Sequence, residues 1–425
     1  MDQPSKLLRS LRVLILGLVI VIVVLGVALI ILVIANAGTQ VELGQVDVLA
    51  NSSDECVTCH REASPGIVNQ FSHSSMAAAE VTCRDCHEVE SSYPRAVEHE
   101  GANILAAPTT ARCEKCHEAE VAQFYQSRHS LPSFVAVAGS IELSPNLMAM
   151  YQAIPEGSFA PDKARNAIAA IEGPVMTPFT CESCHSIGAP AADESVGRCQ
   201  KCHIRHEFSL EQARKPETCN NCHIGPDHPQ WEIYQESAHG IQYATMGSTW
   251  NWGAEAGNLS VTDFPAPTCA LCHMSGFGTT GTTHDVGDRL SWFLFASLSQ
   301  QRPNWQDNRT RMQSVCFECH NENFISDLYT AADAATQHVN DWVTESNDLM
   351  SQLQSRDLLT PAQFDEPIDF EYFNLWHYWG RTTKFGMWMQ GPDYSQWHGA
   401  YPLLESMADL REMVEDKLQA AGATP

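Results

Sequence analysis

The stretch CQKCHIRHEFSLEQARKPETCNNCHIGPDHPQW, from Cys199 to Trp231, contains the pattern Cys-x-x-Cys-His twice. In this pattern the two thiols attach the edge of a haem covalently, and the histidine binds the haem iron from one side. The same stretch has two histidines outside the pattern, His206 and His228, and Asp227 precedes His228. The stretch therefore predicts covalently bound c-type haems, and it leaves open what His206 and His228 do.

The pattern accounts for every cysteine of the 425-residue chain. All 16 cysteines fall into eight copies. Paired cysteines at this spacing also bind zinc. A histidine follows the pair in all eight copies, however, and this favours haem. Because every cysteine belongs to one of the copies, none is left for a disulfide. We therefore expect eight haem c groups. The attaching thiols are Cys56, Cys59, Cys83, Cys86, Cys113, Cys116, Cys181, Cys184, Cys199, Cys202, Cys219, Cys222, Cys269, Cys272, Cys316 and Cys319, and the iron-binding histidines are His60, His87, His117, His185, His203, His223, His273 and His320.

A membrane anchor is predicted near the N-terminus. Residues 13–35 form an uncharged apolar run of 23 residues, which is long enough to span a bilayer. Lys6, Arg9 and Arg12 precede the run, and the next basic residue is Arg61. This asymmetry places residues 1–12 in the cytoplasm and the haem region on the periplasmic, extracytoplasmic side of a single-pass cell-membrane protein. The alternative is a signal peptide cleaved after Ala37.

The formal net charge of −26 limits the classes of partner. An acidic surface repels nucleic acid and anionic lipid, so we expect no nucleic-acid partner. The charge also keeps an exported protein soluble, and this ordinary role is at least as good an explanation as any specific basic partner.

The predicted fold class is mainly α, with sparse secondary structure around packed haems. Proline and glycine interrupt the haem region, and no long alternating strand pattern is present. So many motifs in so little chain indicate that the porphyrins supply much of the apolar interior and lie close enough to pass electrons. After the last motif, apolar residues recur at helical spacing. The expected organisation is a linker over residues 36–55, an octahaem domain over residues 56–325 and a helical C-terminal region over residues 326–425.

Of the 18 histidines, eight belong to the motifs and ten do not. If every iron bound a second histidine, eight of these ten would be used and the protein would be a pure electron-transfer conduit. If one iron is open to a substrate, seven are used. The count alone permits both.

The segment from Cys199 to Gly240 resembles the central part of the octahaem hydroxylamine oxidoreductases. The sequences TWNWG (Thr249–Gly253), APTCALCHM (Ala266–Met274) and TTHD (Thr282–Asp285) continue the resemblance. It covers about residues 56–325 well and the C-terminal region loosely.

The resemblance implies a substrate haem at the fourth motif, Cys181–His185, whose iron has no second protein ligand. It implies that Asp227 and His228 are catalytic, with His228 exchanging protons with a nitrogen substrate. The other seven haems would be bound by two histidines and carry electrons. The second ligands implied by the match are His73, His99, His129, His206, His239 and His284, with His377 as the best match for the seventh and His338 or His398 as alternatives.

One departure from the family bears on the direction of reaction. In the oxidative members, a tyrosine from a neighbouring chain is cross-linked to the substrate haem, and a loose alignment places Gln390 at that position. The resemblance therefore implies reduction of nitrite or hydroxylamine to ammonium, with hydroxylamine or hydrazine oxidation as the alternative. It also implies a homotrimer that takes electrons from a membrane quinol dehydrogenase or a c-type cytochrome.

Overall fold

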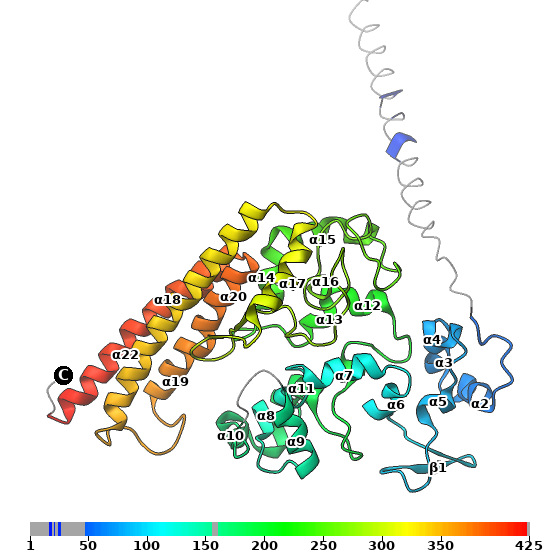
Figure 1. Ribbon diagram of the computed structural model, residues 1–425, viewed down its shortest axis with the longest axis horizontal. Helices are drawn as coiled ribbons and strands as arrows, with labels where there is room; N and C mark the ends of the chain where they lie inside the picture. The colour runs from blue at the N-terminus through cyan, green and yellow to red at the C-terminus, as the bar shows by residue number, and fades with distance from the viewer. Residues whose placement is uncertain (1–16, 19–20, 22–23, 27–46, 155–159, 423–425) are drawn as a thin grey trace, which may run out of the picture. The chain divides into compact units, whose positions relative to one another are not determined.

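The computed structural model describes residues 17–18, 21, 24–26, 47–154 and 160–422 (Figure 1). The chain divides into two compact units, residues 1–73 and residues 74–425. In the first unit, α2 (Glu55–Ala63) contains the first haem motif, and α3 (Pro65–Ser72) packs against α2. The boundaries predicted at residues 55/56 and 325/326 stay predictions.

The haem-binding part of the second unit consists of short helices joined by irregular loops. The helices are α4 (Ser75–Ala78), α5 (Cys83–His87), α6 (Thr110–Glu114), α7 (Glu118–Gln126), α8 (Leu131–Ala138), α9 (Pro145–Ala153), α10 (Ala167–Met176), α11 (Cys181–His185), η1 (Ser186–Gly188), η2 (Cys199–Lys201), α12 (Leu210–Arg214), α13 (Pro216–Asn220), α14 (Gln230–Glu236), α15 (Ala238–Met246), η3 (Gly247–Thr249), α16 (Cys269–His273) and α17 (Trp305–Phe317). The strands pair antiparallel as β1 (Val97–His99) with β2 (Ala102–Ile104) and β3 (Trp292–Phe293) with β4 (Gln300–Gln301).

Three of the motifs are themselves single helical turns, namely α5, α11 and α16. The turn of α5 starts at a capping box, in which Thr82 accepts from the backbone of Asp85 and the Asp85 carboxylate accepts from the backbone of Thr82. The Thr268 side chain likewise accepts from Leu271 N at the start of α16. Residues three apart in a helix share a face, so a capped turn puts both thiols of a motif on one side.

The C-terminal part forms a helical bundle with its own core. Figure 1 shows α18 (Glu322–Gln354) beside α22 (Tyr401–Ala420), and α18 also contacts α20 (Arg381–Met389). Leu403, Met407 and Leu410 repeat at helical spacing on α22 and are buried with Val339 and Val343 of α18. The remaining elements are α19 (Pro367–Asn374), the π-helical turn η4 (Leu375–Gly380), α21 (Pro392–Ser395) and the π-helical turn η5 (Gln396–Ala400).

The expected fold class is confirmed in that the described residues are mainly helical with little sheet. The predicted anchor over residues 13–35 lies mostly outside the described residues. Across those residues that are described, no helix is both long and apolar enough to cross a membrane.

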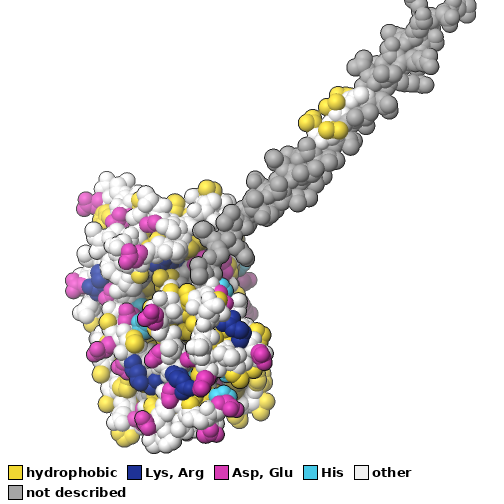
Figure 2. Space-filling model, turned by 90° about the vertical axis from the view of Figure 1, so that its right-hand side faces the viewer, with side chains coloured by type: hydrophobic (Ala, Val, Ile, Leu, Met, Phe, Trp, Pro, Cys, Tyr) yellow, Lys and Arg dark blue, Asp and Glu magenta, His cyan; other side chains and the backbone are white. Residues whose placement is uncertain are grey.

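The surface carries the acidic excess that the composition requires. In the space-filling view, carboxylate side chains are spread over the visible face among fewer lysines and arginines (Figure 2). Carboxylates are not gathered into one patch on this face, so the charge marks no single docking surface there.

Candidate haem ligands and active site

The cysteines form no disulfide with one another. All 16 lie in the described part of the chain, and each is paired by sequence only with the other cysteine of its own motif. The unpaired thiols, each pair followed by a histidine, fit the donor set of c-type haems.

Four motif histidines each face a second histidine at a similar distance. Metal–nitrogen bonds to imidazole are about 2 Å long, so two axial imidazoles on one iron have ring centres roughly 6 Å apart. The four pairs therefore fit irons bound from both sides. Their ring-centre distances are 6.4 Å for His87–His206, 5.9 Å for His129–His223, 6.3 Å for His203–His284 and 6.0 Å for His239–His320.

The orientation of several rings also fits iron binding. His87 Nδ1 lies 2.7 Å from Leu105 O, His185 Nδ1 lies 2.7 Å from Ser133 O, and His73 Nδ1 lies 2.6 Å from Asn69 O. A ligating histidine usually donates its other ring N–H to a carbonyl or carboxylate in this way, which fixes the ring and leaves Nε2 for the metal.

Asp227 and His228 form a close pair within electrostatic reach of the fourth motif. Asp227 Oδ2 lies 2.5 Å from His228 Nδ1, and the His228 ring packs on Phe295 with ring centres 4.9 Å apart. Burial lowers the pKa of His185, and the charges of His228 and Asp227 act on this pKa as well. In the described residues, no histidine ring faces His185. The same holds for His117 and His273, so the Asp227–His228 pair is what distinguishes the surroundings of His185.

Two residues of the C-terminal region complete this cluster. Arg381 Nη1 donates to His377 Nε2 at 2.9 Å and lies 3.7 Å from Asp227 Oδ2, while His377 Nε2 lies 3.8 Å from the same oxygen. Helix α20 reaches the cluster because it packs on α14, and the Thr382 hydroxyl donates to Pro226 O. Asp227, His228, His377 and Arg381 are called the Asp227 cluster below.

The loop between β3 and β4 covers one side of the Asp227 cluster and is fixed by several hydrogen bonds. Arg381 Nε donates to Phe295 O at 2.9 Å. Lys384 Nζ donates to Ser299 Oγ at 2.8 Å, and the Asn340 side chain both donates to and accepts from the Ser299 backbone at 2.8 Å. These bonds hold Phe295 against His228.

Burial and neighbouring charges determine the charge states of Asp227, Arg381 and His377 in the Asp227 cluster. Burial acts to raise the pKa of Asp227, but the hydrogen bond from His228 and the charges of His228, His377 and Arg381 outweigh it, so this pKa is lowered. Burial lowers the pKa of Arg381 to about 10 and, together with the charge of Arg381, lowers that of His377 to about 3. At neutral pH the cluster therefore holds a carboxylate, a guanidinium cation and a neutral His377 imidazole.

A known protein family matches most of the amino-acid sequence of this chain. Residues 79–367 match the family described as seven times multi-haem cytochrome CxxCH, and this range contains the second to eighth motifs. The chain belongs to the multihaem cytochrome family. Covalently bound c-type haems follow from this membership. The first motif, Cys56–His60, lies outside the matched range.

One relative of this cytochrome has a name from nitrogen metabolism. This cytochrome is 30% identical over 246 residues to a probable nitrite reductase-hydroxylamine oxidoreductase fusion protein of Kuenenia stuttgartiensis, a match that covers 52% of this chain and 25% of that protein. The chain thus spans about a quarter of that relative's length.

Two solved structures share the fold. A hypothetical multiheme protein superimposes with a TM-score of 0.75 at 20% identity, covering 90% of this chain and 99% of that one. A reducing HAO-like protein complex of Kuenenia stuttgartiensis superimposes with a TM-score of 0.63 at 19% identity, covering 86% of this chain and 85% of that one.

The assignment of His377 as the seventh second ligand stays a prediction, and the contacts of this residue link it to Asp227 and Arg381. Its Nε2 accepts from Arg381 and lies near Asp227, and its ring stacks on Phe373 with centres 4.2 Å apart. These contacts assign His377 to the Asp227 cluster. The alternatives also stay predictions: His338 is exposed beside Trp342, and His398 Nδ1 lies 3.0 Å from Asp393 Oδ2.

Other predicted ligands stay predictions. His73 follows α3 in the first unit, and His99 ends β1 in the second. His223 has two histidine neighbours, since the His228 ring centre also lies 6.4 Å from its own. Distance alone does not separate His129 from His228 as its partner across an iron.

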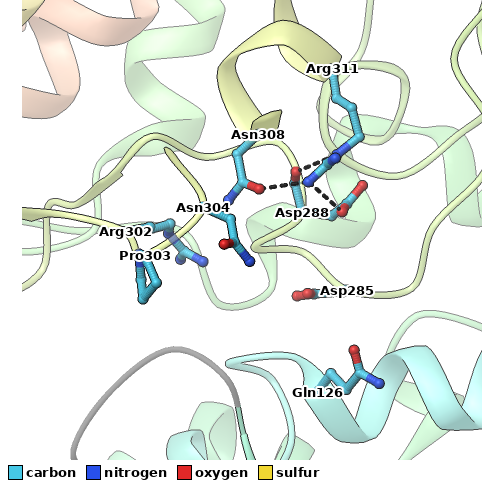
Figure 3. Close-up of a pocket in the computed structure, with 8 residues that line it drawn as sticks. All are labelled: Gln126, Asp285, Asp288, Arg302, Pro303, Asn304, Asn308 and Arg311. Carbon is cyan, nitrogen blue, oxygen red and sulfur yellow. Dashed lines mark hydrogen bonds and ion pairs between the residues drawn. The ribbon is translucent and has the colours of Figure 1, made fainter. Parts of the chain in front are cut away.

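A polar cavity of about 130 Å³ lies between α7 and the segment that leads into α17 (Figure 3). Asp285, which follows His284, lines it together with Asp288, Arg302 and Arg311, and Gln126 of α7 closes the opposite side. Burial raises the pKa of Asp285 to about 6. No residue of the Asp227 cluster lines the cavity, so the cavity is separate from that cluster.

Arg381 and Phe295 are parts of the site that no motif in the sequence indicated. Both lie far along the chain from Asp227 and outside any recognisable motif. A basic residue one helical turn after His377, in a stretch rich in aromatic residues, is the signal that was present.

Proposed function

We propose that this cytochrome is an octahaem reductase that converts nitrite or hydroxylamine to ammonium at the haem of the fourth motif. The observation that carries the proposal is the Asp227–His228 pair, held at 2.5 Å within electrostatic reach of His185. The names of the relatives support the substrate class, and the four histidine pairs support electron transfer to the site.

The proposed roles follow from the contacts. When bound through Cys181, Cys184 and His185, the haem supplies electrons to the substrate. His228 supplies protons, because reduction of a nitrogen oxyanion consumes protons with the electrons and a histidine titrates near neutral pH. Asp227 holds His228 through Nδ1, which fixes the ring and keeps Nε2 as the group that meets the substrate. Phe295 packs against the His228 ring and shields it from water.

Reduction is favoured over oxidation by the residue at the end of α20. Gln390 stands where the resemblance expects the cross-linking tyrosine of the oxidative enzymes, and it is exposed as the left-handed C-cap of the helix. Tyr394 is close in sequence, but its ring stacks on His398. Hydroxylamine or hydrazine oxidation is therefore the alternative.

The proposal includes the setting of the enzyme. Residues 13–35 would anchor it as a single-pass protein with the haem domain on the periplasmic side, near a quinol dehydrogenase or c-type cytochrome that supplies electrons. N-terminal sequencing of the mature protein tests the anchor, because a start after Ala37 would show that the segment is removed.

The first prediction is that one haem binds external ligands. The purified holoprotein should show a high-spin component that is converted by added cyanide or nitrite, and it should form ammonium from nitrite with a chemical electron donor. Assays of hydroxylamine oxidation under matched conditions decide the direction. A spectrum with only low-spin signals, unchanged by cyanide, would favour an electron-transfer conduit and contradict the proposal.

A further inference from the structure

Arg381 is a buried cation whose bonding capacity is only partly used. Its side chain is 11% exposed, Nε donates to Phe295 O, and Nη1 donates to His377. A guanidinium carries five N–H donors in a planar fork. Among the described residues, Nη2 has no hydrogen-bond partner, and the nearest carboxylate oxygen, on Asp227, is 3.7 Å from Nη1. One edge of the fork is therefore available near Asp227, the carboxylate that holds His228.

The charge balance around Arg381 also favours an anion. Among the described residues, Asp227 is the one carboxylate whose charge acts on the pKa of Arg381, and it already accepts from His228. Lys384, one turn along α20, is fully buried at 0% exposure and donates to Ala296 O and Ser299 Oγ. Burial and the charge of Arg381 lower the pKa of Lys384 to about 7, so this amine is only partly protonated at neutral pH. The site therefore holds one full positive charge and part of a second against one carboxylate, so it attracts a small anion and repels a further cation.

We propose that Arg381 is a substrate-binding residue that makes the site selective for a nitrogen oxyanion of the class of nitrite over neutral hydroxylamine. This inference rests on the proposed function, and it specifies the substrate class. A planar fork matches the two oxygens of a bent oxyanion, and a charged hydrogen bond is stronger than a neutral one. Neutral hydroxylamine offers no full negative charge to the guanidinium.

The test compares two ligands in one variant. Arg381→Gln should raise the nitrite dissociation constant and the nitrite KM by about 10- to 100-fold, as expected for loss of a charged hydrogen bond. Its effect on the hydroxylamine KM should be several-fold smaller, and Arg381→Lys, which keeps the charge, should restore part of the nitrite binding. Equal changes for nitrite and hydroxylamine would overturn the inference.

A matched control separates binding from support of the loop. Asn340→Ala removes both side-chain bonds to Ser299 without touching the guanidinium. It should change nitrite and hydroxylamine binding alike. If it discriminates between them as strongly as Arg381→Gln does, the effect arises from the position of Phe295, and the inference is wrong.

A measurement on the unaltered protein covers the case in which the variants do not fold. Formate has nearly the shape of nitrite and carries its charge, whereas formamide is its neutral counterpart. Formate should compete with nitrite, and formamide at the same concentration should compete far less. Equal inhibition by both would contradict the inference while leaving nitrite reduction intact, whereas absence of any ligand binding would instead contradict the proposed function.

Discussion

At the scale of single residues, His228 allows two roles that one substitution separates. As a proton donor it should leave haem attachment and the low-spin spectrum unchanged when replaced in His228→Ala. Turnover should then fall by about 10²- to 10⁴-fold, which is the rate factor that a positioned acid–base group usually contributes. The measurement is steady-state nitrite reduction together with the optical or paramagnetic resonance spectrum of the same sample.

Asp227→Asn is the control for this prediction, because it keeps the His228 imidazole and disturbs only its orientation and basicity. Turnover should fall less than in His228→Ala. A new high-spin signal in His228→Ala would instead mean that His228 binds the iron held by His223. His129, whose ring centre lies 5.9 Å from that of His223, would then need another role.

At the scale of elements, the C-terminal bundle supports the site through the packing of α18 and α22. Leu403 is 0% exposed in this core, and its neighbour Leu404 is 49% exposed. Leu403→Ala should destabilise the bundle by about 2–5 kcal/mol, because a buried leucine leaves a cavity. Leu404→Ala should cost well under 1 kcal/mol, since it creates no cavity.

The measurement for the bundle is the shift of the urea midpoint of helix loss, followed by circular dichroism. Because α18 and α20 supply Asn340 and Arg381, Leu403→Ala should also weaken nitrite binding before the haems lose their low-spin spectrum. Equal midpoints for Leu403→Ala and Leu404→Ala would show that this core contributes little.

At the scale of the whole molecule, the resemblance predicts a homotrimer without covalent links between chains. The purified protein should sediment as a trimer under native conditions. Because Gln390 occupies the position of the cross-linking tyrosine, denatured protein should run as one band of single-chain mass. A native monomer would contradict the assembly, and a denatured band at a multiple of the chain mass would contradict the assignment of Gln390.

Chemistry that is local in the chain could be predicted from the amino-acid sequence. A motif such as Cys83–His87 specifies haem attachment because its ligands share one capped helical turn, and the period of Leu403, Met407 and Leu410 specifies a buried helix face. The adjacency of Asp227 and His228 was likewise visible in the sequence. These features depend on spacings of a few residues, which backbone geometry fixes without reference to the rest of the fold.

Contacts between residues that are distant in the chain became visible in the folded structure. His87 faces His206, and Arg381 and Phe295 join Asp227, through the packing of separate elements such as α14 against α20. His377 shows the limit of the sequence most clearly. The resemblance implied His377 as a ligand, whereas its place beside Arg381 and Asp227 follows from the path of η4, set by the bundle core around Leu375. Packing between elements depends on side chains far apart in the chain, and no local spacing encodes it.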